Sequence, residues 1–119
     1  MLSENEFKKM KDEVFIVNTA RGELIDIEDL YNNLKTGKVR GAALDIMECE
    51  SLTLFQRKDE ANPKCADIVN ITKKLFSMPN VIITPHIAYN TYETVNYLLE
   101  ATFNNIRDNL KGMSSDRVC

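Results

Sequence analysis

The sequence predicts an α/β fold, with a parallel sheet of about three strands flanked by helices in three layers. Two observations predict this class. Short apolar runs at residues 14–17, 39–44 and 81–84 are typical of strands that are buried on both faces. Segments with helical periodicity alternate with these runs, so each strand reaches the next through a crossover connection that makes neighbouring strands parallel.

The first half of the chain predicts two helices that alternate with two strands. A capping box at Ser3 begins a short helix that ends around Lys11, and the first strand follows at residues 14–17. Asp26 caps the second helix, and Gly37 ends it before the strand at residues 39–44. The apolar stripe of this helix, spaced i, i+3, i+4 and i+7, faces the sheet. It consists of Ile27, Leu30, Tyr31 and Leu34.

The second half contains a long excursion, a strand and two helices. Residues 47–66 lose all periodicity, and such an excursion in a compact domain is often functional. A helix is expected from Asp67 to Phe76, and a strand at residues 81–84 is stopped by a proline. A final amphipathic helix covers residues 91–111. The remaining residues, 113–119, are expected to form a flexible tail.

Composition excludes several classes of function. The net charge is −3 and acidic and basic residues are interspersed, so no basic stripe is available to bind nucleic acid. The apolar runs are as short as strands, so no membrane span is expected. The start of the chain lacks the apolar core of a signal peptide. We therefore expect a cytoplasmic protein.

The cysteines are Cys49, Cys65 and Cys119. Their number is odd, their spacings are wide and no CxxC motif is present, so reduced thiols in a cytosolic protein are expected. A zinc site built from Cys49, Cys65 and His86 is a less favoured alternative, because structural zinc ligands usually come in close pairs. No metal site is predicted.

Polar residues follow the predicted strands at their carboxyl ends, where parallel sheets bind ligands. His86, the only histidine, can give or take a proton near neutral pH. Glu50 can stabilise the charged imidazole, and the planar fork of Arg21 suits a carboxylate or a carbonyl. Together they suit a small anionic substrate whose carbonyl is protonated as it is reduced.

Each of these residues also has a structural interpretation. Arg21 could pair with Asp26 or Glu23, and Glu50 lies in an acidic stretch of a kind that is usually solvated. The acid that ends the second strand, Asp45, could cap a turn. Pattern alone leaves both interpretations open.

The sequences of three segments together resemble those of a known family. VNTARGELID at residues 17–26, GAALDIMECE at 41–50 and NVIITPHIAYNT at 80–91 occur together and in order. In this respect the chain resembles the D-isomer-specific 2-hydroxyacid dehydrogenases, and most closely their D-lactate dehydrogenase-like branch. The resemblance covers nearly the whole chain.

The resemblance implies a catalytic set. Arg21 matches the substrate-binding arginine, His86 the general acid/base, and Glu50 the glutamate that pairs with the histidine. In such enzymes a hydride passes from NADH to the carbonyl carbon of a 2-oxo acid, such as pyruvate, while the histidine protonates the oxygen. The product is a D-2-hydroxy acid, such as D-lactate.

The resemblance also implies NAD as the cofactor. Thr19 and Ala20 match a strand end whose backbone lies against the nicotinamide side of NAD, and Asp45 matches an acid near the nicotinamide carboxamide. Members of the family are about three times as long and open their nucleotide-binding domain with GxGxxG, which this chain lacks. Residues 1–112 are therefore expected to be the C-terminal half of an NAD-binding Rossmann-like domain plus the long helix that returns to the substrate domain.

Two hypotheses follow. In the first, the chain is a fragment of a 2-oxo acid reductase that is inactive alone, tends to associate through an exposed sheet edge, and is a homodimer when complete. In the second, it is a non-catalytic half-domain that docks with a separately encoded N-terminal half. The first is preferred, because catalytic residues would have little reason to persist in a docking module. Neither hypothesis involves nucleic acid or a membrane.

Overall fold

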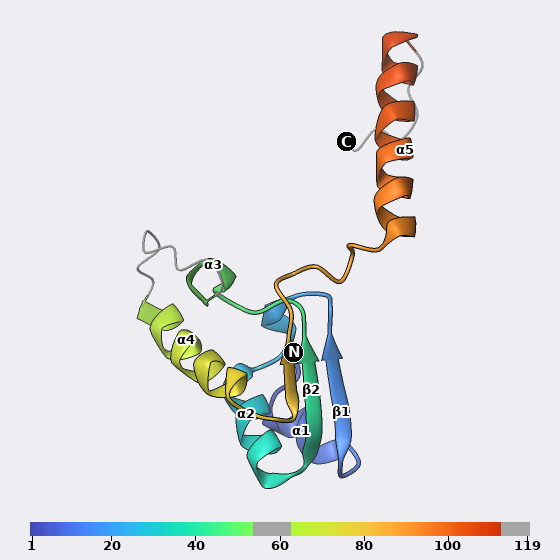
Figure 1. Cartoon of the computed structure of the whole chain (residues 1–119). Helices are drawn as coiled ribbons and strands as arrows, with labels where there is room; N and C mark the ends of the chain where they lie inside the picture. Colours follow the sequence, from blue (N-terminus) through green and yellow to red (C-terminus); the bar gives the residue numbers. More distant parts are fainter. Residues whose placement is uncertain (54–62, 113–119) are drawn as a thin grey trace. The chain divides into compact units, whose positions relative to one another are not determined.

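The computed structural model describes residues 1–53 and 63–112 (Figure 1). The chain divides into two compact units, Met1–His86 and Ile87–Cys119, and each is described by itself. The predicted flexible tail at residues 113–119 lies outside the described residues.

The first unit is an α/β sheet with its helices. Its strands β1 (Val14–Asn18), β2 (Val39–Leu44) and β3 (Val81–Ile83) are parallel and lie in the order β1-β2-β3. The helical segments are α1 (Glu4–Lys9), the 3₁₀ turn η1 (Gly22–Leu24), α2 (Ile27–Thr36), α3 (Glu50–Thr53) and α4 (Pro63–Phe76). The predicted Rossmann-like α/β class and the three parallel strands flanked by helices are confirmed.

Local signals explain where the helices begin and end. Asp26 accepts hydrogen bonds from the backbone of Glu28 and Asp29, and Gly37 ends α2 at φ 80°, a conformation that glycine adopts without strain. Helix α4 begins at Pro63, four residues before the predicted start at Asp67. Proline is favoured at the first helical position, because it has no N–H to leave unpaired there. The four-residue α3 lies within the predicted excursion.

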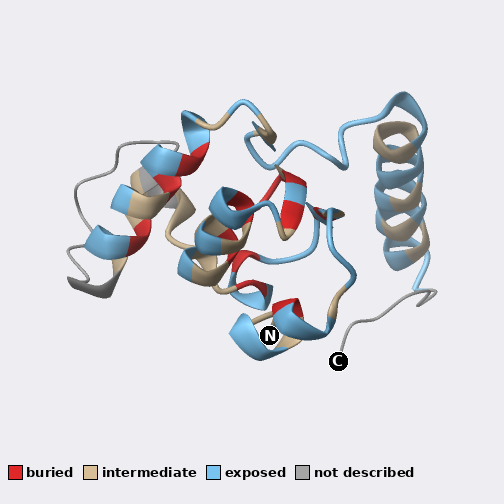
Figure 2. Cartoon of the chain, turned by 90° about the horizontal axis from the view of Figure 1, so that it is seen from below, coloured by how far each residue is buried: buried red, intermediate tan, exposed pale blue. Residues whose placement is uncertain are grey.

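One face of the sheet carries the core. Ile16, Ala42 and Leu44 project from β1 and β2 into a cluster that is completed by the helices. The helical contributors include Phe7 of α1, Leu30 and Leu34 of α2, and Leu75 of α4. Figure 2 colours buried segments red. This packing confirms the predicted inward stripe of α2.

The other face of the sheet is exposed. Phe15, Val17 and Ile82 alternate with the core residues along β1 and β3, and they are 68%, 71% and 67% exposed. The expectation that the strands are buried on both faces is therefore wrong for this unit. The physical reason is that the core-forming residues of α1, α2 and α4 gather on the face of Ile16 and Leu44.

Strand β1 also borders a cleft of about 700 Å³. It is lined by residues of β1 and the turn after it, including Phe15, Val17, Thr19 and Ala20, and by Met1 and Leu24. Since β1 is an outer strand of the described sheet, this cleft follows its unpaired edge.

The second unit contains α5 (Tyr92–Leu110). The Thr91 hydroxyl accepts from the backbone N–H of Thr94 at 3.2 Å and caps the helix. Among the described helices, α5 included, none combines the length and the apolar character that a membrane crossing requires.

Candidate active site

The turn after β1 is organised by Asn18. This side chain is 6% exposed, its Oδ1 accepts from the backbone N–H of Ala20 at 3.1 Å, and its Nδ2 donates to the carbonyl of Arg21 at 2.8 Å. The two bonds fix the backbone of Thr19, Ala20 and Arg21 at the carboxyl edge of the sheet. The Thr19, Ala20 and Arg21 side chains are exposed there.

Arg21 extends from this turn. Its Nη1 donates to the carbonyl of Ala20 at 2.7 Å. Within the described residues it forms no ion pair with Asp26 or Glu23, so the alternative weighed for it is not what the structure shows. Its guanidinium keeps further donors with which to bind an anion.

Gly22 brings this turn against the segment that follows β2. A Cβ atom added at position 22 would lie 2.2 Å from the Glu48 nitrogen and 2.4 Å from the Met47 carbonyl carbon. Only glycine leaves room for so close an approach of two backbones. The turn that carries Arg21 is thus packed directly on the segment that leads to Glu50.

Asp45 joins the carboxyl ends of all three strands. Its backbone N–H donates to the carbonyl of Asn18 at 2.9 Å, and its own carbonyl accepts from the N–H of His86 at 2.9 Å. Its carboxylate accepts from the Thr84 hydroxyl at 2.5 Å, and the residue is only 4% exposed. A buried carboxylate held in this way has a fixed orientation, which suits a group that must receive a ligand.

His86 and Glu50 meet across 36 residues of sequence. The distance from His86 Nδ1 to Glu50 Oε2 is 3.1 Å, and the two side chains are 43% and 22% exposed. His86 has φ 56°, and its N–H donates to the carbonyls of Asp45 and Thr84, so its backbone conformation is held by the end of β3. Because Nδ1 faces Glu50, Nε2 is the nitrogen that can exchange a proton with a ligand.

The structure therefore brings two of the predicted residues into contact with His86 and places three others at the end of another strand. Asp45 contacts His86 through its backbone, and Glu50 contacts His86 through its side chain. Arg21, Thr19 and Ala20 lie at the end of the neighbouring strand β1, on the same edge of the sheet. None of the described hydrogen bonds joins Arg21 to the His86–Glu50 pair.

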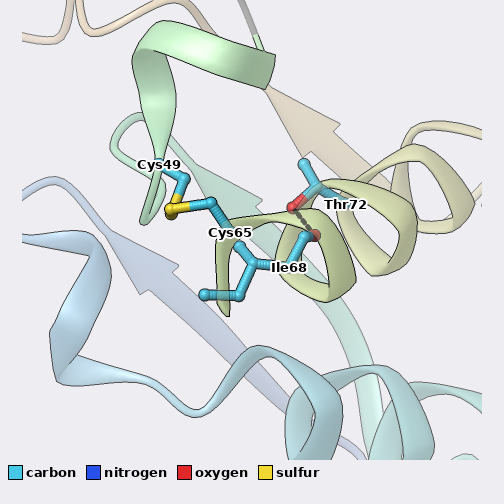
Figure 3. Close-up of a disulfide and its surroundings, with 4 residues drawn as sticks. All are labelled: Cys49, Cys65, Ile68 and Thr72. Atoms are coloured by element: carbon cyan, nitrogen blue, oxygen red, sulfur yellow. Dashed lines mark hydrogen bonds between the residues drawn. A yellow bond between two sulfur atoms is a disulfide. The ribbon is translucent and has the colours of Figure 1, made fainter. Parts of the chain in front are cut away.

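The structure overturns the expectation that the cysteines are reduced. Cys49 and Cys65 form a disulfide, with their Cα atoms 5.8 Å apart, so the prediction of reduced thiols is wrong for this pair (Figure 3). The zinc alternative fails as well, because these sulfur atoms are bonded to each other. Across the described residues, no cluster of three or more histidine, cysteine or acidic side chains could hold a metal ion. Sequence spacing could not reveal the bond, since a loop of any length can close if its ends meet.

Two organising residues were missed at the level of sequence. Asn18 directly follows the apolar run of β1, and Thr84 directly follows that of β3. A polar residue placed immediately after a buried strand is a signal that could have found both. Their hydrogen bonds hold the Thr19–Ala20–Arg21 turn and the Asp45 carboxylate.

The chain matches a known protein family over most of its length. The family model described as "D-isomer specific 2-hydroxyacid dehydrogenase, NAD binding domain" matches residues 1–88. The chain is 43% identical, over all of its length, to 35% of an aromatic 2-oxoacid reductase of Clostridium sporogenes. It is also 43% identical, over 87% of its length, to 30% of a D-lactate dehydrogenase of Lactiplantibacillus plantarum.

Solved structures agree with these matches. The NAD-complexed form of a D-isomer specific 2-hydroxyacid dehydrogenase of Lactobacillus delbrueckii ssp. bulgaricus superposes with a TM-score of 0.81 at 31% identity, covering 100% of this chain and 35% of that one. The D-lactate dehydrogenase of Lactobacillus jensenii, solved with NAD+, gives a TM-score of 0.81 at 34% identity and covers 100% and 34%.

These matches define the family. The chain belongs to the D-isomer specific 2-hydroxyacid dehydrogenases, and its residues 1–88 match the NAD-binding domain of that family. The predicted family and its cofactor, NAD, are confirmed. The chain spans about a third of the length of the curated relatives it matches.

Proposed function

We propose that this chain supplies the proton-transfer part of the active site of an enzyme that reduces 2-oxo acids to D-2-hydroxy acids, such as pyruvate to D-lactate. The observation that carries the proposal is the pairing of His86 Nδ1 with Glu50 Oε2 at 3.1 Å, on the edge of the sheet that also holds Arg21. An imidazole that has a carboxylate on one nitrogen and belongs to a side chain that is 43% exposed is suited to general acid catalysis through its second nitrogen.

Each residue of the proposed set has one role. Protonated His86 gives the proton on Nε2 to the substrate's carbonyl oxygen. Glu50 accepts a hydrogen bond from Nδ1, orients the ring, and stabilises its positive charge until the proton leaves. Arg21 binds the substrate carboxylate through its guanidinium fork.

The residues at the strand ends fit the nicotinamide end of NAD. NADH, when bound, supplies the hydride that the carbonyl carbon receives. Thr19 and Ala20 are exposed residues at the end of β1, and Asp45 offers a buried carboxylate held by Thr84. A carboxylate in this position can accept a hydrogen bond from an amide group. The GxGxxG phosphate loop is absent from the sequence, so these residues would hold only part of the cofactor.

Domain organisation and partners follow from the same proposal. Residues 1–112 are the C-terminal half of the NAD-binding domain with the helix that returns to the substrate domain, and the N-terminal half is the required partner. The complete enzyme is a homodimer and acts in the cytoplasm. Alone, the chain is inactive, because cofactor affinity and the rest of the substrate site depend on residues outside it.

A chimera tests the proposed roles. The matching third of the Clostridium sporogenes aromatic 2-oxoacid reductase is replaced by this chain, and NADH oxidation is followed with pyruvate and with a bulkier 2-oxo acid. We expect turnover by the chimera, a fall of about 100-fold or more in His86→Ala, and a smaller fall in Glu50→Gln. Lys73→Ala, an exposed change on α4, is the matched control and should leave turnover unchanged. Unchanged turnover in His86→Ala would refute the assignment.

The isolated chain tests the claim of inactivity. The 119-residue chain is assayed alone at micromolar concentration with NADH and the same two 2-oxo acids. We expect no NADH oxidation above the rate in buffer. Sustained turnover that disappears in His86→Ala would contradict the claim.

A second candidate function is favoured by the exposed face of the sheet and by the cleft along β1. In it, the chain is a non-catalytic half-domain that docks with a separately encoded N-terminal half. Mixing the two halves should then give a stable complex in sedimentation experiments, and activity should return on mixing. If no complex forms at micromolar concentrations, this second function is excluded.

A further inference from the structure

The Cys49–Cys65 disulfide lies directly beside the proposed catalytic pair. Cys49 is the residue before Glu50, and its sulfur is bonded to that of Cys65, which is 16 residues later in the sequence (Figure 3). Both cysteines are partly buried rather than enclosed. Cys49 belongs to the segment that presents Glu50 to His86, so the bond acts directly on that segment.

The α4 side of the bond is firmly anchored. Thr72 and Leu75 are fully buried, Ile68 is 8% exposed, and the Thr72 hydroxyl donates to the carbonyl of Ile68 at 2.8 Å. Helix α4 packs against α2 and β3, so Cys65 is attached to the core of the unit.

The α3 side of the bond is a short helix. Helix α3 has only four residues, Glu50–Thr53, and so short a helix is not stable by itself. The carbonyl of Cys49 accepts from the N–H of Leu52 at 3.0 Å, so Cys49 forms the start of the helix whose first residue is Glu50. The disulfide fixes Cys49 to α4, and consecutive Cα atoms are always about 3.8 Å apart, so it also restrains Glu50.

We propose that the Cys49–Cys65 disulfide is a redox-controlled link that positions Glu50 against His86, and that its reduction loosens this pair. The inference rests on the proposed function only for its catalytic consequence, since the geometry is a property of the chain itself. In reducing compartments, disulfides are usually transient and often sense redox state, which suits a bond at this place.

The chemistry is ordinary thiol–disulfide exchange. One thiolate of a small dithiol attacks a cysteine sulfur, the Cys49–Cys65 bond breaks, and a mixed disulfide forms. The second thiol of the reductant then closes a cyclic disulfide and releases the protein sulfur. Two electrons and two protons end on Cys49 and Cys65, and the reductant is oxidised by the same amount. Glutathione disulfide reverses the reaction and leaves as two thiols.

His86 reports the outcome, because it is the only histidine in the chain. The hydrogen bond from Nδ1 to Glu50 holds the proton of the neutral ring on Nδ1, and the ¹⁵N shifts of the two ring nitrogens measure this tautomer directly. The full chain with Cys119→Ser, which removes the third thiol, is compared after oxidation with glutathione disulfide and after reduction with dithiothreitol, at a pH where the ring is neutral.

We expect the ratio of Nδ1–H to Nε2–H tautomer to fall about twofold or more on reduction. Cys65→Ser under oxidising conditions should match the reduced chain, because it removes the link at the end distant from Glu50. In Glu50→Ala, which removes the acceptor, the ratio should not respond to redox state. Amide exchange in α4 and β2 should stay unchanged, which separates a local link from general unfolding.

Several results would overturn the proposal. One is the same tautomer ratio in the oxidised and reduced chains, and another is a redox response that persists in Glu50→Ala. Two free thiols at Cys49 and Cys65, detected by mass spectrometry after oxidation, would also reject the proposal, as would loss of amide protection throughout α4 on reduction.

Failure of the proposed function can be distinguished from failure of the redox-controlled link. The chimera would then lack turnover, while His86 would still respond to redox state. If the proposed function and the redox-controlled link are both correct, reduction should lower kcat of the chimera about tenfold and shift KM less.

Discussion

The two faces of the sheet are built from similar residues and have opposite surroundings. Ile16 and Leu44 on one face are 8% and 3% exposed, whereas Phe15 and Val17 on the other are 68% and 71% exposed. All four are large apolar residues on adjacent strands. The comparison shows that burial of a strand residue depends on what packs opposite it, which the strand's own sequence does not record. Contiguous apolar surface of this kind is typical of an interaction site.

The largest expected effect is on the covered face. Leu30 of α2 is fully buried in the core, so Leu30→Ala should lower the free energy of unfolding by about 3 kcal/mol, measured by urea denaturation. Val17→Ala is the matched control on the exposed face, and it should cost less than about 1 kcal/mol. Equal losses for the two variants would show that both faces are packed in solution.

A middle-sized effect is expected on association rather than on stability. Replacing Phe15 and Ile82 by serine should change the free energy of unfolding by only about 0.5 kcal/mol, because both side chains are mostly exposed. It should shift the chain toward monomer in sedimentation velocity, since it removes apolar surface that associates. If the wild-type chain is already monomeric at the highest concentration, the exposed face does not mediate association.

The smallest effect concerns α1, whose Phe7 is part of the covered core. The Ser3 hydroxyl and backbone N–H both donate to the Glu6 carboxylate, at 2.6 and 3.1 Å, and these bonds lower the pKa of Glu6 below its ordinary value of 4.5. A lowered folded-state pKa stabilises the fold above pH 4.5, and this contribution is lost as the pH falls through the lowered value.

Amide exchange in α1 between pH 6 and pH 3 measures this contribution. Protection of α1 should fall with acidification in the wild type and depend less on pH in Ser3→Ala, which lacks the hydroxyl donor. Glu6→Gln, which has no titrating carboxyl at this position, should show the weakest dependence. The same acid response in all three chains would refute a role for this capping box.

Much of the fold could be predicted, because its signals are local. Asp26 and Gly37 mark the ends of α2 by capping chemistry that involves neighbouring residues only. The three strands were found from short apolar runs, although β3 ends at Ile83, one residue earlier than expected. The exposure of Phe15 and Val17 could not be predicted, because a strand covered on one face has the same composition as one covered on both.

The site was partly predictable for a similar reason. That His86 and Glu50 meet was expected, because parallel strands bring their carboxyl ends to one edge. The roles of these residues and of Arg21 remain predictions until the chimera is assayed. The disulfide was missed because cysteine spacing gives no information on the direction in which α3 and α4 approach each other.

Gly22 has a consequence for how this chain can evolve. Its backbone touches that of Met47 and Glu48 so closely that no side chain fits between them. If position 22 is randomised in the chimera and the library is selected for turnover, glycine should be recovered almost alone, while exposed neighbours such as Glu23 vary freely. Gly22, which has no side chain, would then be the least replaceable residue of the turn that carries Arg21.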